Sequence, residues 1–412
     1  MAGRRGRALL TALAGTLAVL AAGAGDAGGA APTSAAAPRA AASGPAALAT
    51  PLRVLDWNVQ GGQGTDGVID FDRIIEVIQA EDPDVVTLQE LHDNTDVGGE
   101  NQWQLLLDAL PGWDAHFACS DRNAYGGVAG NLILSRFPIE ERLTHPLPPY
   151  DAASPADRDC PLDTAASPVR RSMGGARIDV GGTDVRVYTT HLSPGLSEPS
   201  VDRRQEQARN ALDKLPASLL TTPMLLTGDF NLRPDDEIRF WTAGEGWYDA
   251  WTEVAPNIGE DAITYPGDTE DARIDYVYAT SGFDVTAAHT VRTGASDHLP
   301  VVVDLAIPDA TPVETGSVLA GAEGLAGWAH LSAFDDGGAT LRVCDNKPDG
   351  WGVRAYLRDG AGGDLAVTGA DPAYADQCGT FTVPAGTLSQ PPSVRVCLYA
   401  GGEEKDCRQR DW

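Results

Sequence analysis

The chain has 412 residues, enough for one large domain and a smaller one, and 42% of them are hydrophobic, which suffices for an ordinary buried core. Acidic residues outnumber basic ones by 59 to 30, and the formal net charge at pH 7 is −29. This charge repels polyanions and disfavours a protein that grips a long DNA duplex through many Lys and Arg contacts, although a bound divalent cation reverses the field locally.

The first 50 residues differ in composition from the rest of the chain. Three arginines among the first seven residues precede an apolar run that begins at Ala8, and small residues follow it. This order is typical of a secretory signal peptide, and the run is shorter than the roughly 20 apolar residues of a membrane-spanning helix. We therefore predict a signal peptide over residues 1–31, a flexible leader over 32–50, and a secreted protein without stable membrane insertion.

From Leu52 onward, short apolar segments alternate with segments of helical spacing, which predicts sheets covered by helices. We predict a catalytic domain over residues 51–309. Helices are expected where apolar residues recur at helical spacing, over 71–78, 103–110 and 202–215. Strands are expected over 52–59, 84–88, 131–134, 176–180, 185–190, 224–227, 274–278 and 300–305. Much of the less regular stretch from Cys119 to Arg171 is expected to form a long loop.

The last hundred residues have a different pattern. Residues 310–326 are rich in Thr, Pro, Gly and Ala, which predicts a linker. Residues 327–412 contain short β-like segments between Gly and Asp turns and few helix signals. We predict a small accessory β-sandwich, stapled by disulfides because a domain of this size has a modest core.

The six cysteines favour disulfides over a metal or redox site. They are even in number and none belongs to a CxxC pair, as in an exported protein with structural bridges. Cys119 and Cys160 form the natural pair in the first domain. Three pairings are open to the other four, which are Cys344, Cys378, Cys397 and Cys407.

Polar side chains stand at the ends of five predicted strands, and Asp275 lies within a further apolar strand. Any one of these clusters has a structural explanation, such as a turn cap, a surface acid or a buried histidine with its hydrogen bonds satisfied. Polar groups at the same end of several strands, however, converge on one pocket, and carboxylate and amide oxygens suit Mg²⁺ or Mn²⁺. The clusters are Asp56-Trp57-Asn58, Gln89-Glu90, Thr190-His191, Gly228-Asp229-Phe230-Asn231 and Ser296-Asp297-His298.

The ordered motifs of residues 52–305 resemble those of the endonuclease/exonuclease/phosphatase superfamily, which includes deoxyribonuclease I. The GDFN and SDHLP elements are specific, and all seven motifs occur in order. The resemblance implies an exported bacterial member with a C-terminal β-domain, and a four-layer α/β sandwich in which two β-sheets lie between layers of helices. The motifs are LRVLDWNVQGG, DVVTLQEL, GNLILSRFPI, TTHLSPG, LLTGDFNLRP, RIDYVYA and SDHLPVVVDL.

The resemblance also implies a metal site. Its cofactor is Mg²⁺, with Mn²⁺ or Ca²⁺ as alternatives. Glu90 is then the principal metal ligand, Asn58 holds the metal and its waters, and Asp297 lies close to the metal. The cation offsets the charge that develops on the phosphate and on the leaving oxygen.

Five further residues receive roles in catalysis from the same resemblance. Asp229 orients or deprotonates the attacking water, and Asn231 donates its amide to the phosphate or the nucleophile. His191 hydrogen-bonds a phosphate oxygen. His298 contacts the phosphate, and Asp275 fixes the tautomer of this imidazole. The sequence leaves open whether Asp229 or His298 is the general base.

Other residues depart from the pattern or add to it. Gln60 stands where the abasic-site DNA repair branch carries an acid, which disfavours a repair endonuclease. Arg171 is a candidate for binding a substrate phosphate, with a salt-bridged or solvent-facing role as the alternative. Asn131 is a candidate for the pocket, with turn capping as the alternative, and Tyr265 for the substrate mouth.

These observations favour a secreted, Mg²⁺-dependent hydrolase of phosphate esters, a phosphodiesterase or nuclease that acts as a monomer. Its partner is a phosphate-ester substrate, with nucleic acid ranked first. One alternative is a small soluble or lipid phosphate ester, although a lipid-directed enzyme should carry an exposed apolar hairpin and none is evident. Another is a non-catalytic surface-binding protein with a degenerate enzyme domain, which the complete polar set disfavours. The ligand of the accessory domain is not indicated.

Overall fold

The computed structural model describes residues 49–412 except for gaps, so the expected signal peptide and most of the leader lie outside the described residues. The described part of the chain belongs to one compact unit. Within that part, no helix has both the length and the apolar character needed to cross a membrane. The gaps are 94–100, 123–126, 149–169, 216–221, 234–237, 239–241, 243–245, 255–261, 267–271, 309–311, 321–325, 346–349, 361–363, 370–376 and 390.

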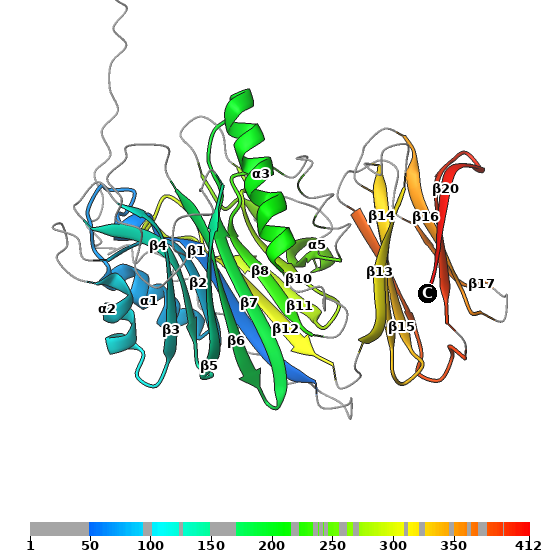
Figure 1. Cartoon of the computed structure of the whole chain (residues 1–412), viewed down its shortest axis with the longest axis horizontal. Coiled ribbons are helices and arrows are strands. Elements are labelled where there is room, and N and C mark those ends of the chain that lie inside the picture. Colours follow the sequence, from blue (N-terminus) through cyan, green and yellow to red (C-terminus); the bar gives the residue numbers. More distant parts are fainter. Residues whose placement is uncertain are drawn as a thin grey trace, which may run out of the picture. The chain divides into compact units, whose positions relative to one another are not determined.

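One six-stranded sheet is built from β1 (Thr50–Asn58), β2 (Val85–Asp93), β3 (Asp114–Arg122), β4 (Val128–Ser135), β11 (Asp284–Thr290) and β12 (Val301–Ile307). The strand order is β11-β12-β1-β2-β4-β3, and β1 pairs parallel with β2 and antiparallel with β12 (Figure 1). Side chains of β1 alternate between the two faces, since Val54 packs between the sheets while Leu55 and Trp57 pack against helices.

The second six-stranded sheet is built from β5 (Ile139–Leu147), β6 (Arg171–Val180), β7 (Thr183–His191), β8 (Met224–Asp229), β9 (Tyr248–Asp249) and β10 (Asp275–Ala279). Its strand order is β5-β6-β7-β8-β10-β9. The helix α3 (Glu198–Lys214) connects β7 to β8, which pair in parallel, whereas β10 pairs antiparallel with both β8 and β9.

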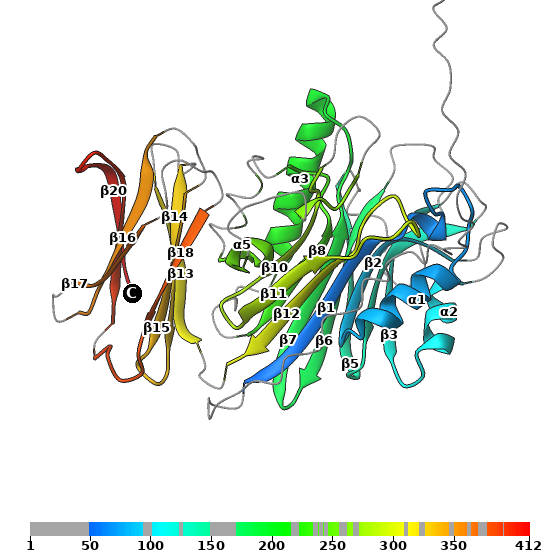
Figure 2. The ribbon, with the colours of Figure 1, turned by 180° about the vertical axis from the view of Figure 1, so that it is seen from behind.

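Three apolar clusters hold these elements in four layers. One fills the space between the two sheets and contains Val54, Val187 and Val277. Another packs α1 (Asp72–Glu81) and α2 (Gln102–Ala109) on the outer face of the first sheet. The third packs α3 on the outer face of the second sheet (Figures 1 and 2). The predicted four-layer α/β sandwich is therefore confirmed.

The stretch from Cys119 to Arg171 is more regular than the sequence predicts. It contains the end of β3, the whole of β4, and β5, while residues 149–169 lie outside the described residues. The sequence hides β5 because this strand is at an edge of its sheet and most of its side chains are partly exposed. Its polar and apolar residues therefore do not follow the strict alternation that marks a half-buried strand.

The C-terminal region forms two four-stranded sheets, β13-β14-β15-β18 and β17-β16-β19-β20. A separate apolar cluster lies between them and includes Leu341, Val353 and Val396. This arrangement confirms the predicted small β-sandwich. The strands are β13 (Pro312–Ala320), β14 (Gly327–Phe334), β15 (Ala339–Asp345), β16 (Gly352–Arg358), β17 (Asp364–Gly369), β18 (Gln377–Val383), β19 (Ser393–Ala400) and β20 (Glu403–Asp411).

One part of the sequence-based division differs in the structure. The segment 310–326, predicted as a linker, contains β13, which pairs along its length with β14. Its Thr, Gly and Ala composition resembles that of a linker, but an edge strand needs few large side chains when its partner supplies the hydrogen bonds. Val318 and Ala320 are nevertheless buried in the sandwich core.

Disulfides form in the regions where they were expected. Cys397 and Cys407 are bonded to each other and join β19 to β20. Cys344 is also disulfide-bonded, and it faces Cys378 in the register of β15 and β18. Cys119 is disulfide-bonded as well, whereas Cys160, its predicted partner, lies outside the described residues.

Replacing Cys397 and Cys407 together by Ala should lower the free energy of unfolding by about 2–3 kcal/mol, because the bridge closes a short loop in the unfolded chain. The two cysteines are 10 positions apart. Chemical denaturation followed by the fluorescence of the C-terminal tryptophans measures the change, with Glu403→Gln on the exposed strand β20 as the control. A loss no larger than that of the control would contradict this prediction.

Candidate active site

Strand register brings the polar clusters together at one edge of the two sheets. Asn58 pairs with Gln89 at the ends of the parallel strands β1 and β2. His191 pairs with Asp229 at the ends of the parallel strands β7 and β8, and the same Asp229 pairs with Asp275 at the start of β10. Since the carboxyl ends of parallel strands lie at one edge, residues far apart in sequence share one site.

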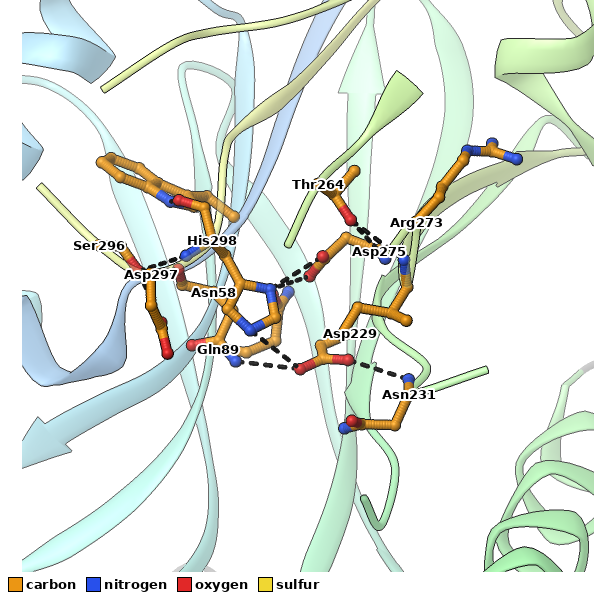
Figure 3. Close-up of polar contacts among 12 residues, drawn as sticks. Asn58, Gln89, Asp229, Asn231, Thr264, Arg273, Asp275, Ser296, Asp297 and His298 are labelled. Atoms are coloured by element: carbon orange, nitrogen blue, oxygen red, sulfur yellow. Dashed lines mark hydrogen bonds and ion pairs between the residues drawn. The ribbon is translucent and has the colours of Figure 1, made fainter. Parts of the chain in front are cut away.

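Asp229 is at the centre of this site and is almost fully buried. Its Oδ2 accepts a hydrogen bond from Asn58 Nδ2 at 3.1 Å. The same oxygen lies 3.3 Å from His191 Nε2 and 3.8 Å from His298 Nε2. Its Oδ1 accepts the backbone N–H of Asn231 at 2.9 Å. One carboxylate therefore contacts two imidazoles and a side-chain amide from distant segments of the chain. Figure 3 shows Asp229 between His298 and Asn231.

Asp275 holds the other side of the His298 ring. His298 Nδ1 lies 2.9 Å from Asp275 Oδ2, so its proton is on Nδ1 facing this carboxylate. Thr264 Oγ1 accepts the backbone N–H of Asp275 at 3.1 Å, and Trp57 Nε1 donates to the carbonyl of His298 at 2.9 Å. Figure 3 shows the imidazole held between Asp275 and Asp229.

The pKa values of Asp229 and His298 are both raised above their usual values. Burial and the adjacent Asp275 carboxylate raise the pKa of Asp229 to about 7. Burial lowers the pKa of His298, but the attraction and hydrogen bond of Asp275, together with Asp229 and Asp297, outweigh it and raise this pKa to about 10. At neutral pH His298 is therefore an imidazolium between two acids.

The second imidazole has the opposite protonation state. Burial, followed by the positive charges of Arg171 and His298, holds the pKa of His191 well below its usual value. His191 is therefore neutral at pH 7, and it lies 3.8 Å from Glu90 through Nδ1. The two histidines can thus perform different tasks at one pH, one as a cation and the other as a neutral hydrogen-bonding group.

Glu90 projects from an irregularity in β2. The pairing of β2 with β4 shifts between Leu88 and Leu91, and Glu90 has a left-handed φ of 59°. This bulge breaks the alternation of the strand, so that Gln89 is buried while Glu90 is partly exposed. Glu90 Oε1 accepts a hydrogen bond from Asn58 Nδ2 at 3.3 Å, so Asn58 links Glu90 to Asp229.

Gly228 is required by the close approach of β7 and β8. Its φ is 134°, and a Cβ atom there would lie 1.9 Å from the carbonyl oxygen of Thr190. Any side chain would push apart the two strands that carry His191 and Asp229. The close approach of these strands therefore explains why the GDFN motif begins with glycine.

Asp297 lies at the same edge through contacts that the sequence did not predict. Gln60 Nε2 donates to Asp297 Oδ2 at 2.9 Å. Ser296 Oγ lies 3.4 Å from Asp297 Oδ1 and donates to the carbonyl of Asn58 at 2.8 Å. Gln60 therefore positions an acid of the site, Asp297.

The donor set fits a hard divalent cation. Glu90 and Asp297 offer carboxylate oxygens, and these are the ligands that Mg²⁺ and Ca²⁺ prefer. Asn58 Oδ1 accepts the backbone N–H of Gln60 at 3.1 Å, and an amide oxygen has a second lone pair for a cation or its water. Burial and the neighbouring Asp275 carboxylate raise the pKa of Asp229. A cation bound nearby would offset this negative charge.

Asp229, Asp275 and His298 also offer ligand atoms within 4.8 Å of one another. We interpret this trio as a hydrogen-bonded acid–imidazole system, because His298 Nδ1 already binds Asp275. Its other ring nitrogen, Nε2, lies 3.8 Å from Asp229 Oδ2, so the imidazole links the two acids.

Arg171 and Asn131 have different places in the structure. Arg171 begins β6 and is partly buried; loss of hydration lowers its pKa, while Asp229, Glu90 and Asp121 raise it. Its Nε has no hydrogen-bond partner among the described residues. Asn131 is inside β4 rather than at a turn, and its Nδ2 donates to the carbonyl of Ser172 at 2.9 Å, beside Arg171. Arg171 therefore faces the site carboxylates, and Asn131 supports its strand.

Asn231 was predicted to donate its amide to the phosphate or the nucleophile, but one of its contacts is with the protein itself. Its side-chain Nδ2 donates to the carbonyl of Leu192 at 3.0 Å, within the site edge. Its backbone is left-handed, with a φ of 51°, at the last residue of the GDFN motif. An amide has two N–H groups, so one remains for a substrate oxygen.

A buried polar network beneath the site was not predicted from the sequence. Asp56 Oδ1 accepts from Thr87 Oγ1 at 2.7 Å and from Gln89 Nε2 at 2.8 Å. Gln89 also donates to Thr189 Oγ1 at 3.0 Å, and Thr227 Oγ1 donates to Thr87 at 2.8 Å. Burial and then Asp275 raise the pKa of Asp56 to about 8. These contacts join the two sheets, and their only sequence signal is a polar residue within each apolar strand.

Tyr265 lies next to the His298 ring, with 4.8 Å between the ring centroids. It is partly exposed, and it pairs with Ala272 in an isolated bridge just before β10. This placement agrees with the predicted position at the mouth of the site.

Comparisons with known proteins point in one direction. Residues 57–298 match the model of the endonuclease/exonuclease/phosphatase family, and residues 311–405 match the model of that family's ig-like domain. A crystal structure described as an endonuclease/exonuclease/phosphatase from Beutenbergia cavernae DSM 12333 is 33% identical, covers 88% of this chain and 100% of its own, and has a TM-score of 0.75. One from Bacteroides vulgatus is 19% identical, with 62% and 98% covered and a TM-score of 0.51, which is a likeness of fold. No curated protein matches the chain.

In the metal-free protein, Asp275→Asn should lower the pKa of His298 from about 10. The expected shift is roughly 1–3 units, because the variant removes the nearest negative charge while burial continues to favour the neutral ring. A titration of the imidazole nitrogens by NMR measures it. Asp297→Asn is the control, and its effect should be smaller because Asp297 is a weaker cause of the shift. An unchanged titration in Asp275→Asn would rule out this pairing.

Proposed function

We propose, from the premise that this chain belongs to the endonuclease/exonuclease/phosphatase family, that it is a secreted, Mg²⁺-dependent phosphodiesterase that cleaves nucleic acid. Family members are metal-dependent phosphoric ester hydrolases, and this chain is an enzyme of that class. The observation that carries the proposal is the contact of the buried Asp229 carboxylate with Asn58, His191 and His298 beside Glu90.

The cation would be held by Glu90 and Asn58, with Asp297 close to it or to its waters. When bound, it polarises the phosphoryl group and offsets the charge that develops on the phosphate and the leaving oxygen. Glu90 and Asp297 are the partly exposed members of this set, so a cation at their carboxylates would be accessible to a phosphate from solvent. The preference for oxygen ligands favours Mg²⁺, with Mn²⁺ or Ca²⁺ as alternatives.

Asp229 is placed to take a proton from the attacking water. Its raised pKa makes it a stronger base than an exposed aspartate. With a cation held at Glu90 and Asn58, this carboxylate would be ionised near neutral pH. Asn58 and the backbone N–H of Asn231 hold its two oxygens, so the carboxylate has one orientation. We assign the general base to Asp229 rather than His298, because His298 is already protonated at neutral pH.

Three side chains of the site would bind the phosphate, namely His298, His191 and Arg171. His298 donates from Nε2 as an imidazolium, while Asp275 holds its Nδ1 proton. His191 is neutral and donates a single hydrogen bond. Arg171 would supply a partly buried guanidinium near the same carboxylates, and a guanidinium suits two phosphate oxygens at once.

The charge of the chain limits which nucleic acid it can bind. A net charge of −29 repels a polyanion, so binding would rely on the cation and a few site residues. A single strand or a short stretch of duplex suits such a short footprint. A small phosphate ester is the competing substrate, because it needs only the phosphate contacts described above.

Secretion is supported by two independent features of the sequence. The N-terminal composition is that of a signal peptide, and disulfides are characteristic of oxidising compartments. Extracellular Mg²⁺ and Ca²⁺ are available to an enzyme outside the cell, so the proposed cofactor and the location agree.

Glu90→Gln should raise the Mg²⁺ concentration needed for half-maximal rate by roughly 10- to 100-fold, because one carboxylate charge leaves the cation site. EDTA should abolish the activity and added Mg²⁺ should restore it. Titration of the rate with MgCl₂ measures both. Glu198→Gln, an exposed change at the start of α3, is the control. A metal dependence equal to that of the wild type would remove Glu90 from the ligand set.

The substrate class is tested with plasmid DNA, RNA, a chromogenic phosphodiester and sphingomyelin vesicles, each with Mg²⁺. The nucleic acids should be cleaved fastest, and Asp229→Asn should slow cleavage by about 10²- to 10⁴-fold without unfolding the protein. Cleavage of the small ester alone would overturn the nuclease assignment. Cleavage of sphingomyelin alone would assign a lipid headgroup instead.

A further inference from the structure

A buried ion pair joins the C-terminal sandwich to the catalytic domain. Arg342 of β15 donates from Nε to Glu253 Oε2 at 2.6 Å, and both side chains are at most 7% exposed. The guanidinium carbon of Arg342 also lies 4.2 Å from the ring centroid of Tyr248. Tyr248 belongs to β9, and Glu253 belongs to α5 (Ala250–Val254), the short helix that follows it.

The same short helix is tied to the strand of the active-site aspartate. Asp249, between Tyr248 and α5, accepts two hydrogen bonds from Arg273 at 2.6 and 2.7 Å, with both side chains buried. It also accepts the backbone N–H of Trp251 at 3.1 Å. Arg273 is two residues before Asp275, as Figure 3 shows. Asp249 therefore holds the backbone that leads into β10.

Backbone pairing completes the connection to His298. Tyr248 and Asp249 of β9 pair with Ala279 and Tyr278 of β10. β10 begins with Asp275, whose carboxylate holds His298 Nδ1 at 2.9 Å. A displacement of α5 and β9 would therefore move β10, and with it the carboxylate that orients the imidazole.

Apolar packing agrees with this path. Trp328 and Cys344 of the C-terminal sandwich belong to the same buried cluster as Tyr248 and Trp251 of the catalytic domain. β9 has only two residues and α5 has five, so these elements have little surface of their own with which to stay in place. Part of their cover comes from the sandwich.

We propose that Arg342 is a positioning residue of the active site, which fixes α5 and β9 so that β10 presents Asp275 to His298. The proposal rests on the proposed function for its kinetic consequence, but not for its structural one. A buried ion pair contributes little net stability compared with apolar residues of similar size, whereas it demands one geometry. A geometric role explains why two charges are buried at this junction.

The test uses the full chain with Arg342→Met and Glu253→Met combined, which removes both charges and leaves neither one buried alone. Arg342→Lys keeps the charge but loses the planar contact with Tyr248. The matched control is Arg354→Met with Glu404→Gln, an ion pair of 3.6 Å on the other sheet of the same sandwich. Each protein is measured for kcat and KM on the chromogenic phosphodiester, for Tm, and for hydrogen exchange of the β10 amides.

For the double-Met variant we expect kcat to fall by roughly 10- to 100-fold, because a small misplacement of a catalytic group has an effect of this size. KM should change by a smaller factor than kcat, since His191, Arg171 and Glu90 lie on strands other than β10. Exchange of the Asp275–Ala279 amides should become faster. Arg342→Lys should lie between this variant and the wild type, and the control should match the wild type in kcat and in β10 exchange.

An unchanged kcat with unchanged β10 exchange would overturn the proposal whatever the change in Tm, because a purely stabilising pair moves Tm alone. If the double-Met variant does not fold, the same comparison is made with Arg342→Lys. If the wild type cleaves no phosphate ester, the proposed function fails. The hydrogen exchange of β10 then still decides whether Arg342 positions this strand.

Discussion

The active site depends on burying several carboxylates close together while each keeps its own partners. Asp56, Asp229 and Asp275 are all at most 2% exposed. A buried acid without partners is very costly, and here each acid accepts a hydrogen bond from a distant segment of the chain. Asp275 has the His298 imidazole, and Asp56 has two side chains of β2. The negative charge that is left unmatched lies toward Glu90, where a divalent cation can balance it.

This constraint explains why the two sheets must meet in one register. Apolar contacts between sheets are not directional, so they alone permit sliding. Hydrogen bonds are directional, and Gln89 joins Asp56 of the first sheet to Thr189 of the second. Gly228 allows β7 and β8 to approach until His191 lies beside Asp229. The polar network thus fixes the geometry that the apolar core leaves free.

Contacts from the C-terminal sandwich also hold the edge of the second sheet in place. β9 and α5 form a short edge element, and a short edge has few backbone hydrogen bonds to hold it. Arg342 supplies a charged contact to this edge, and Trp328 covers it. The sequence alone predicted an accessory β-sandwich and indicated no ligand for it. The buried contacts make the sandwich part of the framework that holds β10.

The sequence by itself determined most of the strands and the set of polar residues around Asp229, because strand alternation and strand-end motifs are local signals. The four-layer sandwich followed from the resemblance of its motifs to a known family. Tertiary structure decided the rest. Asp56, Gln60 and Asn131 obtain their roles from partners on other strands, and β13 was read as a linker because its partner strand defines it. The Arg342–Glu253 pair joins positions 89 residues apart, a contact that no local pattern encodes. Burial and charge compensation arise only when distant segments pack, so they become visible only in the folded chain.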